Sequence, residues 1–153
     1  METITINEIK FSEMRKYFVI LGITCYTEKK RRDADMVERK EYLDQLWAWK
    51  DEQQIKVVTG IRCCGKSVLL EQYQQRLLAN SVASEQIISI NFENLDYEPL
   101  KDYMKLYNYL KERLCADKMT YIFLDEVQEV TSFEKVVDSL YIRDNVDVYK
   151  KGA

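Results

Sequence analysis

The chain has 153 residues, a length that suits one domain with a buried core. Its composition, 46% hydrophobic and 32% charged, excludes a disordered chain and is typical of a globular protein. The net charge of −3 gives no general attraction to phosphate backbones. Binding to nucleic acid would therefore need a local basic patch.

The sequence contains no histidine and four cysteines. The lack of histidine excludes His-based metal sites and nucleophiles paired with histidine. The cysteines have no CxxC spacing, so we expect free thiols and a cytoplasmic protein. Adjacent cysteines rarely form a disulfide with each other because the geometry is strained, so we interpret Cys63 and Cys64 as ordinary loop residues.

The first segment of the chain, residues 1–35, is predicted to be an N-terminal extension of uncertain structure. Its apolar run YFVILGITCY at 17–26 is too short to span a bilayer, so we expect a strand or a buried segment and no membrane anchor. The basic run KKRR at 29–32 is followed by aspartates and is interpreted as a solvated linker.

From residue 36 to residue 153, patterns of helices and strands alternate and predict the folded core. Apolar residues recur at helical spacing over 36–50, 68–78, 100–114 and 133–141. Short apolar runs predict strands over 55–59, 86–92, 119–124 and 146–149. The run MTYIFL at 119–124 lacks polar alternation, which indicates a strand covered on both faces. Together these elements predict an α/β fold with a parallel sheet between helical layers.

The segment GIRCCGKS at 60–67 matches the phosphate-loop pattern GxxxxGK[ST] and lies between a predicted strand and a predicted helix. In such a loop, backbone N–H groups surround a polyphosphate, and glycine permits the required dihedral angles. Lys66 is expected to reach the β- and γ-phosphates, and Ser67 to coordinate Mg²⁺. The predicted nucleotide-binding residues are Gly60, Ile61, Arg62, Cys63, Cys64, Gly65, Lys66, Ser67 and Val68.

A second motif, YIFLDE at 121–126, places two acids directly after a buried strand. Phosphoryl transfer needs a carboxylate there to hold Mg²⁺, and Asp125 is the candidate. Glu126 lies one residue further on, where a carboxylate can orient or deprotonate the attacking water. This pair favours ATP hydrolysis over a kinase that positions nucleotide alone.

The segments GIRCCGKSVLLEQY, SINFEN and YIFLDEVQEVTSFEKVVDSLY resemble the prokaryotic AAA+ type ATPases of AAA domain family fourteen, over about residues 36–149. The resemblance implies a three-layer α/β/α fold of the P-loop NTPase class, additional-strand type, that binds ATP and Mg²⁺. It also implies the strand order 5-1-4-3-2, in which the fourth strand is followed along the chain by a γ-phosphate sensor, a fifth strand, a lid and an arginine finger. Because the sequence ends at Ala153, we expect a fold that is incomplete at its C-terminus, with the phosphate-loop strand at an exposed edge.

The expected function is Mg²⁺-dependent hydrolysis of ATP to ADP and phosphate. We expect slow turnover, since a missing arginine finger alone costs about 10³- to 10⁵-fold in rate. The alternative is a non-catalytic nucleotide-binding or interaction module, or an inactive fragment of a longer ATPase. The expected partners besides ATP are further copies of the chain or a missing C-terminal domain. A nucleic-acid motor component is not supported by the acidic charge.

Overall fold

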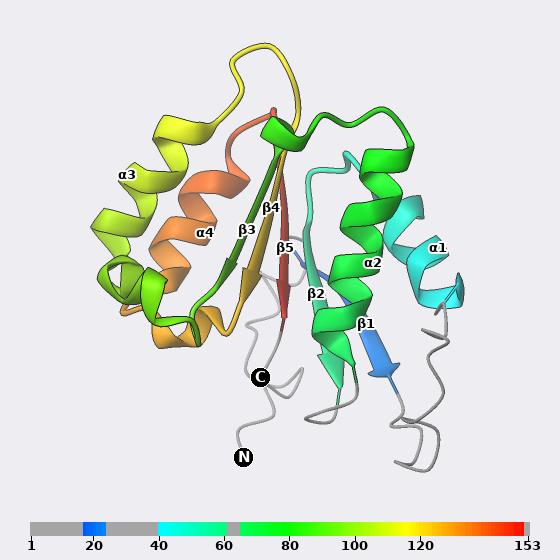
Figure 1. Ribbon diagram of the computed structural model, residues 1–153, viewed down its shortest axis with the longest axis horizontal. Coiled ribbons are helices and arrows are strands. Elements are labelled where there is room, and N and C mark those ends of the chain that lie inside the picture. The colour runs from blue at the N-terminus through cyan, green and yellow to red at the C-terminus, as the bar shows by residue number, and fades with distance from the viewer. Residues whose placement is uncertain (1–16, 24–39, 61–64, 152–153) are drawn as a thin grey trace.

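The computed structural model describes residues 17–23, 40–60 and 65–151. Within these residues, the strands form one sheet in the order β1-β2-β5-β4-β3, and every neighbouring pair is parallel (Figure 1). The strands are β1 (Tyr17–Ile23), β2 (Ile55–Gly60), β3 (Ile87–Asn91), β4 (Thr120–Asp125) and β5 (Val146–Lys151). The helices are α1 (Lys40–Ala48), α2 (Lys66–Ala79), α3 (Tyr103–Arg113) and α4 (Phe133–Tyr141), with short 3₁₀ turns η4 (Ser84–Gln86), η5 (Leu95–Lys101) and η6 (Val127–Glu129).

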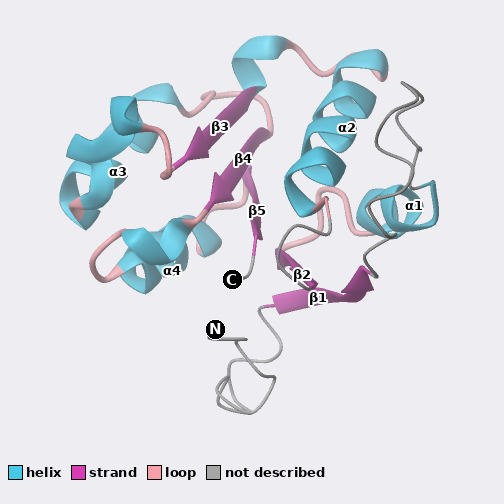
Figure 2. Ribbon diagram, turned by 60° about the horizontal axis from the view of Figure 1, so that its bottom comes forward, coloured by secondary structure: helices cyan, strands magenta, loops and turns pink. Residues whose placement is uncertain are grey.

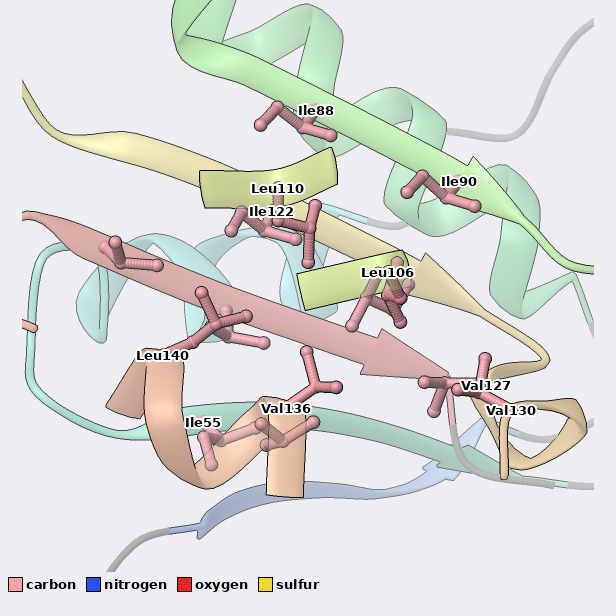
Figure 3. Packing of buried hydrophobic residues seen from close by; sticks show 14 of the residues in the cluster. Ile55, Ile88, Ile90, Leu106, Leu110, Ile122, Val127, Val130, Val136 and Leu140 are labelled. Atoms are coloured by element: carbon pink, nitrogen blue, oxygen red, sulfur yellow. The ribbon is translucent and has the colours of Figure 1, made fainter. Parts of the chain in front are cut away.

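Helices cover both faces of the sheet, as Figures 1 and 2 show: α3 and α4 lie on one face, α1 and α2 on the other. Successive side chains of a strand point to opposite faces, so each strand contributes to two hydrophobic clusters. The cluster under α3 and α4 (Figure 3) includes Ile55, Ile88, Ile90, Ile122, Leu106, Leu110, Val136 and Leu140. The cluster under α1 and α2 includes Leu43, Leu46, Val58, Leu69, Tyr73, Phe123 and Tyr149. The predicted three-layer α/β/α fold is confirmed.

The elements follow the predicted ranges to within a few residues, and the clearest differences at their ends are in α3 and β5. The helix predicted over 100–114 begins with the 3₁₀ turn η5, which contains Pro99, and α3 starts after Asp102. The Asp102 carboxylate accepts a hydrogen bond from the Lys105 N–H at 3.0 Å and so caps α3. β5 extends two residues beyond the predicted end at Tyr149, because Lys151 still pairs with Val58 of β2.

The expectation that the phosphate-loop strand lies at an exposed edge is wrong. β1 runs parallel to β2, from Tyr17 opposite Ile55 to Ile23 opposite Gly60, with one irregularity near its end. β2 therefore has a hydrogen-bonded neighbour on each side, β1 and β5. The apolar run near the N-terminus supplies the strand that satisfies the backbone groups of this edge. As a result, β1 stands where the resemblance placed a fifth strand.

None of the helices in the described part of the chain is long and apolar enough to cross a membrane. Cys115 is a free thiol, as expected. The other cysteines, Cys25, Cys63 and Cys64, lie outside the described residues.

Candidate functional site

Three strands carry the predicted site to one edge of the sheet. β2 ends at Gly60, β4 at Asp125 and β5 at Lys151. The strands are parallel, so these carboxyl ends meet at the same edge, where open α/β sheets bind their ligands. The topology thus brings together motifs that are far apart in the sequence.

Gly65 links the phosphate loop to α2 and adopts a left-handed conformation, with φ 83° and ψ 27°. This conformation costs other L-residues about 1 kcal/mol or more, which explains glycine at this position. α2 begins at Lys66, and the first N–H groups of a helix have no acceptor within it, so they can bind an anion. Val68 is exposed in the first turn of α2. The predicted loop residues Ile61, Arg62, Cys63 and Cys64 lie outside the described residues.

The two motifs meet through a hydrogen bond between Ser67 and Asp125. The Ser67 hydroxyl donates to Asp125 Oδ2 at 2.8 Å, although 58 positions separate the two residues. Hydroxyl and carboxylate oxygens are ligands that Mg²⁺ accepts in nucleotide sites. The predicted metal ligands therefore lie next to each other.

Glu126 turns the chain away from β4 in a left-handed conformation, with φ 56° and ψ 37°. Such a conformation is strained for a residue with a side chain, and strained residues are concentrated at functional sites. The Glu126 carboxylate accepts a hydrogen bond from the Gln128 side chain and lies 2.8 Å from Lys151 Nζ. This backbone turn therefore keeps the second acid at the same edge as Asp125.

The charges around Glu126 hold it in its ionised form. Burial alone would raise the pKa of Glu126, but the hydrogen bond and charge of Lys151 outweigh burial and lower that pKa. Gln128 and the positive charge of Lys66 lower it further. Lys66 itself is buried at the start of α2, with 6% of its surface exposed. An ionised Glu126 is the form that can orient a water molecule or accept its proton.

Lys151, at the end of β5, is a site residue that the sequence analysis missed. Its Nζ lies 2.6 Å from Asp125 Oδ1, 2.8 Å from Glu126 Oε1 and 3.3 Å from Ser67 Oγ. Burial would lower the pKa of Lys151, but the two carboxylates outweigh burial and raise it. Strand alternation could have identified this lysine, because it shares a sheet face with Asp147 and Tyr149. The strand predicted over 146–149 ends two residues before this lysine.

The oxygens at this edge fit a magnesium ion bound together with a nucleotide. Ser67 and Asp125 supply oxygen ligands, and a positive charge, the Lys151 ammonium, already lies against them. In residues 40–60 and 65–151, no group of three or more His, Cys, Asp or Glu side chains could hold a metal alone. Phosphate oxygens and water would complete the coordination, which is usual for Mg²⁺.

Comparisons with known proteins agree with this geometry. The sequence profile of an AAA domain, the fourteenth AAA domain family, matches residues 52–153. An uncharacterized protein of Haemophilus influenzae is 37% identical over 119 residues, which are 77% of this chain and 30% of that protein. The chain thus spans less than a third of the length of this curated relative. No solved structure matches the chain.

Proposed function

This chain belongs to AAA domain family fourteen, and from that premise we propose that it binds ATP with Mg²⁺ at the carboxyl edge of its sheet and hydrolyses it slowly to ADP and phosphate. Membership of the family implies nucleotide binding of the ATPase kind, whereas hydrolysis is the step that we propose. The observation that carries the proposal is the 2.8 Å hydrogen bond between Ser67 and Asp125, which joins the phosphate loop to the acidic end of β4.

Each residue of the site has a distinct role in this proposal. The loop at 60–67 and the start of α2 bind the phosphates, and Lys66 neutralises part of their charge. Ser67 and Asp125 hold Mg²⁺, which supplies further charge neutralisation on the phosphates. Glu126 orients the attacking water and accepts its proton as the water oxygen bonds to the γ-phosphorus and ADP leaves.

Turnover by the chain alone is proposed to be slow because the described arginines lie away from the site. Arg76 pairs with Asp44, and Arg143 donates to the Tyr107 hydroxyl. Arg113 stacks on the ring of Tyr109 in α3. An arginine that reaches the γ-phosphate contributes about 10³- to 10⁵-fold in related reactions. We therefore propose that a second copy of the chain, or a further part of a longer protein, supplies this charge.

Nucleotide binding is tested by thermal unfolding with and without millimolar Mg²⁺ and ATP. We expect ATP to raise the unfolding midpoint of the wild type, since a ligand at about 100 times its Kd stabilises by about 2.7 kcal/mol. Lys66→Ala should lose this increase because the phosphates lose their buried cation. The matched control is Lys105→Ala, which removes an exposed lysine of α3 and should respond like the wild type. A wild type that does not respond to ATP would contradict the proposal.

Hydrolysis is tested by phosphate release with enzyme in excess over ATP. Glu126→Gln should retain the thermal response to ATP and lose about 10²-fold or more of the release rate, because it removes the proton acceptor. Glu112→Gln, an exposed change in α3, is the control and should release phosphate at the wild-type rate. Binding of ATP without any release by the wild type would instead favour the non-catalytic nucleotide-binding module. The same assay with GTP decides the base preference.

A further inference from the structure

The Lys151 side chain occupies the place at which the site would hold its metal. We propose that the Lys151 ammonium competes with Mg²⁺ for Asp125, so that it fills the cation position in the nucleotide-free protein and must leave when Mg²⁺ binds. This inference rests on the proposed function, because that function supplies the nucleotide that binds together with Mg²⁺. The competition with Mg²⁺ itself depends on these side chains alone.

The oxygens around Lys151 come from three separate elements. Nζ lies within 3.3 Å of Ser67 Oγ in α2, Asp125 Oδ1 at the end of β4, and Glu126 Oε1 in the turn that follows. An ammonium group carries three N–H donors, and three oxygens surround it here. The ammonium therefore joins the predicted metal ligands, Ser67 and Asp125, to the predicted water-orienting acid, Glu126.

Asp125 shows why a cation is needed at this position. Its Oδ2 accepts the hydrogen bond from Ser67, whereas its Oδ1 is buried and accepts no hydrogen bond of good geometry. The ion pair with Lys151 at 2.6 Å balances the charge on Oδ1. A buried carboxylate oxygen without such a charge would be costly. Lys151 provides the charge in this structure, and Mg²⁺ would provide it in the loaded site.

The two cations exclude each other. Mg²⁺ binds oxygen at about 2.0–2.1 Å, so an ion held by Ser67 and Asp125 would lie within a few ångströms of an ammonium that contacts the same two side chains, and the two charges would repel each other. The backbone of β5 cannot move aside, because Lys151 pairs with Val58 and Lys150 pairs with Leu124. The Lys151 side chain must therefore rotate off Asp125 when the metal arrives. The free energy of this displacement sets the Mg²⁺ concentration that the site requires.

The first test measures the metal alone, without nucleotide. The thermal midpoints of the wild type and of Lys151→Met are followed as MgCl₂ is added at constant ionic strength. We expect Lys151→Met to unfold at a lower temperature than the wild type in EDTA and to recover with millimolar Mg²⁺, while the wild type responds little. Lys105→Met is the control for loss of an exposed lysine. A Lys151→Met variant that responds to Mg²⁺ no more than the wild type would overturn the proposal.

Two further variants assign the response to this site. Lys151→Arg keeps the positive charge and should respond to Mg²⁺ like the wild type. Lys151→Met combined with Asp125→Asn removes the carboxylate that the metal would bind, so the response should disappear. If the double variant still responded to Mg²⁺, the metal would bind elsewhere and the proposal would be wrong.

The second readout is the Mg²⁺ concentration that half-saturates the binding of fluorescent ADP. Lys151→Met should lower this concentration by about tenfold, the change expected when one charge-assisted contact no longer competes. Weaker ADP binding by Lys151→Met at saturating Mg²⁺ would identify the lysine as a phosphate ligand and overturn the competition. If no variant bound nucleotide, the proposed function would fail, and the titration with metal alone would still decide this inference.

Discussion

Two lysine–carboxylate clusters occupy opposite ends of the same sheet, on the face covered by α1 and α2. At the amino end, Lys56 of β2 pairs with Asp147 of β5 at 2.6 Å, and their side chains are 0% and 1% exposed. At the carboxyl end, Lys151 pairs with Asp125 and Glu126, with side chains that are 12%, 15% and 21% exposed. The two pairs have similar distances but very different surroundings.

The cluster at the amino end is satisfied entirely by the chain itself. Asp147 accepts hydrogen bonds from Lys56, from the Asp51 backbone N–H at 3.0 Å and from the Tyr149 hydroxyl at 2.8 Å. Lys56 also donates to the Glu52 carbonyl at 2.7 Å. With both carboxylate oxygens bonded and both side chains buried, this cluster has a structural role in holding β2 against β5.

The cluster at the carboxyl end depends on one ammonium that can be exchanged. Asp125 Oδ1 has Lys151 as its charge partner, and the cluster opens toward the end of the sheet rather than into the core. The buried Lys56–Asp147 pair, with all its hydrogen bonds made inside the protein, supports the fold. The Lys151–Asp125 pair lies at a strand end and depends on one side chain, so it is suited to exchange of that cation for a ligand. The difference lies in burial and saturation of hydrogen bonds, not in residue type.

The largest expected effect is the loss of stability when the cluster at the amino end is broken. Lys56→Met leaves Asp147 buried without its cation and should lower the free energy of unfolding by about 3–5 kcal/mol, measured by urea denaturation. Lys151→Met should cost less, about 1–2 kcal/mol, because Asp125 Oδ1 loses its charge partner but the side chains of this cluster are partly exposed. Equal losses for the two variants would contradict the distinction drawn between the clusters.

A smaller effect is expected from alkaline pH at the same amino end. Burial raises the pKa of Tyr121, whose hydroxyl donates to Asp51 at 2.6 Å, to about 12. Burial likewise raises the pKa of Tyr73 and of Tyr149. A raised pKa means that the folded state favours the neutral hydroxyl of Tyr121. The contribution of Tyr121 to the free energy of unfolding is therefore complete below its pKa in the unfolded chain, near 10, and is lost as pH rises through about 12.

We therefore expect the free energy of unfolding to fall by about 1–2 kcal/mol from the Tyr121 contribution between pH 10 and pH 12. Urea denaturation at a series of pH values measures this fall. Tyr121→Phe should be less stable at neutral pH, where it lacks the hydrogen bond to Asp51, and should lose less stability on going to pH 12. A pH profile identical in both proteins would show that Tyr121 does not contribute.

The smallest expected effect is a gain in stability at a position remote from both clusters, which provides a reference for the others. Ser81 follows α2 with φ 69°, and the Val82 N–H donates to the Leu77 carbonyl at 3.1 Å, the pattern of a helix end that favours glycine. Ser81→Gly should raise the free energy of unfolding by about 0.5–1 kcal/mol. Thermal and urea denaturation check this, with no change expected in the response to Mg²⁺ and ATP.

The sequence was sufficient to predict the elements and the two motifs, because both depend on local patterns. Apolar periodicity located the helices and strands of the core, and the spacing of Gly60, Gly65, Lys66 and Ser67 indicated the phosphate loop. The acids of β4 followed from an apolar run that ends in two carboxylates. The structure places Ser67 beside Asp125. The predicted roles of loop residues 61–64, which lie outside the described residues, stay predictions.

Most of the missed features depend on pairing between distant strands. The pairing of β1 with β2 needs a register across the sheet that no local pattern encodes. Lys56 and Asp147 are 91 positions apart, and each looks in the sequence like an exposed charge at a strand end. Lys151 differs, because it was missed when the predicted strand ended two residues too early, although its contacts with β4 and α2 also join distant parts of the chain.

The position of β5 between β2 and β4 has a geometric consequence. Neighbouring strands lie about 4.8 Å apart, so the strand that leads into the phosphate loop and the strand that ends in the acids are separated by about 10 Å. Ser67, in the first turn of α2, nevertheless reaches Asp125 at the end of β4. β5 lies between these two strands, so the residue that ends it stands midway between the phosphate loop and the acids. The side chain at position 151 is therefore placed to contact a ligand at the centre of the site.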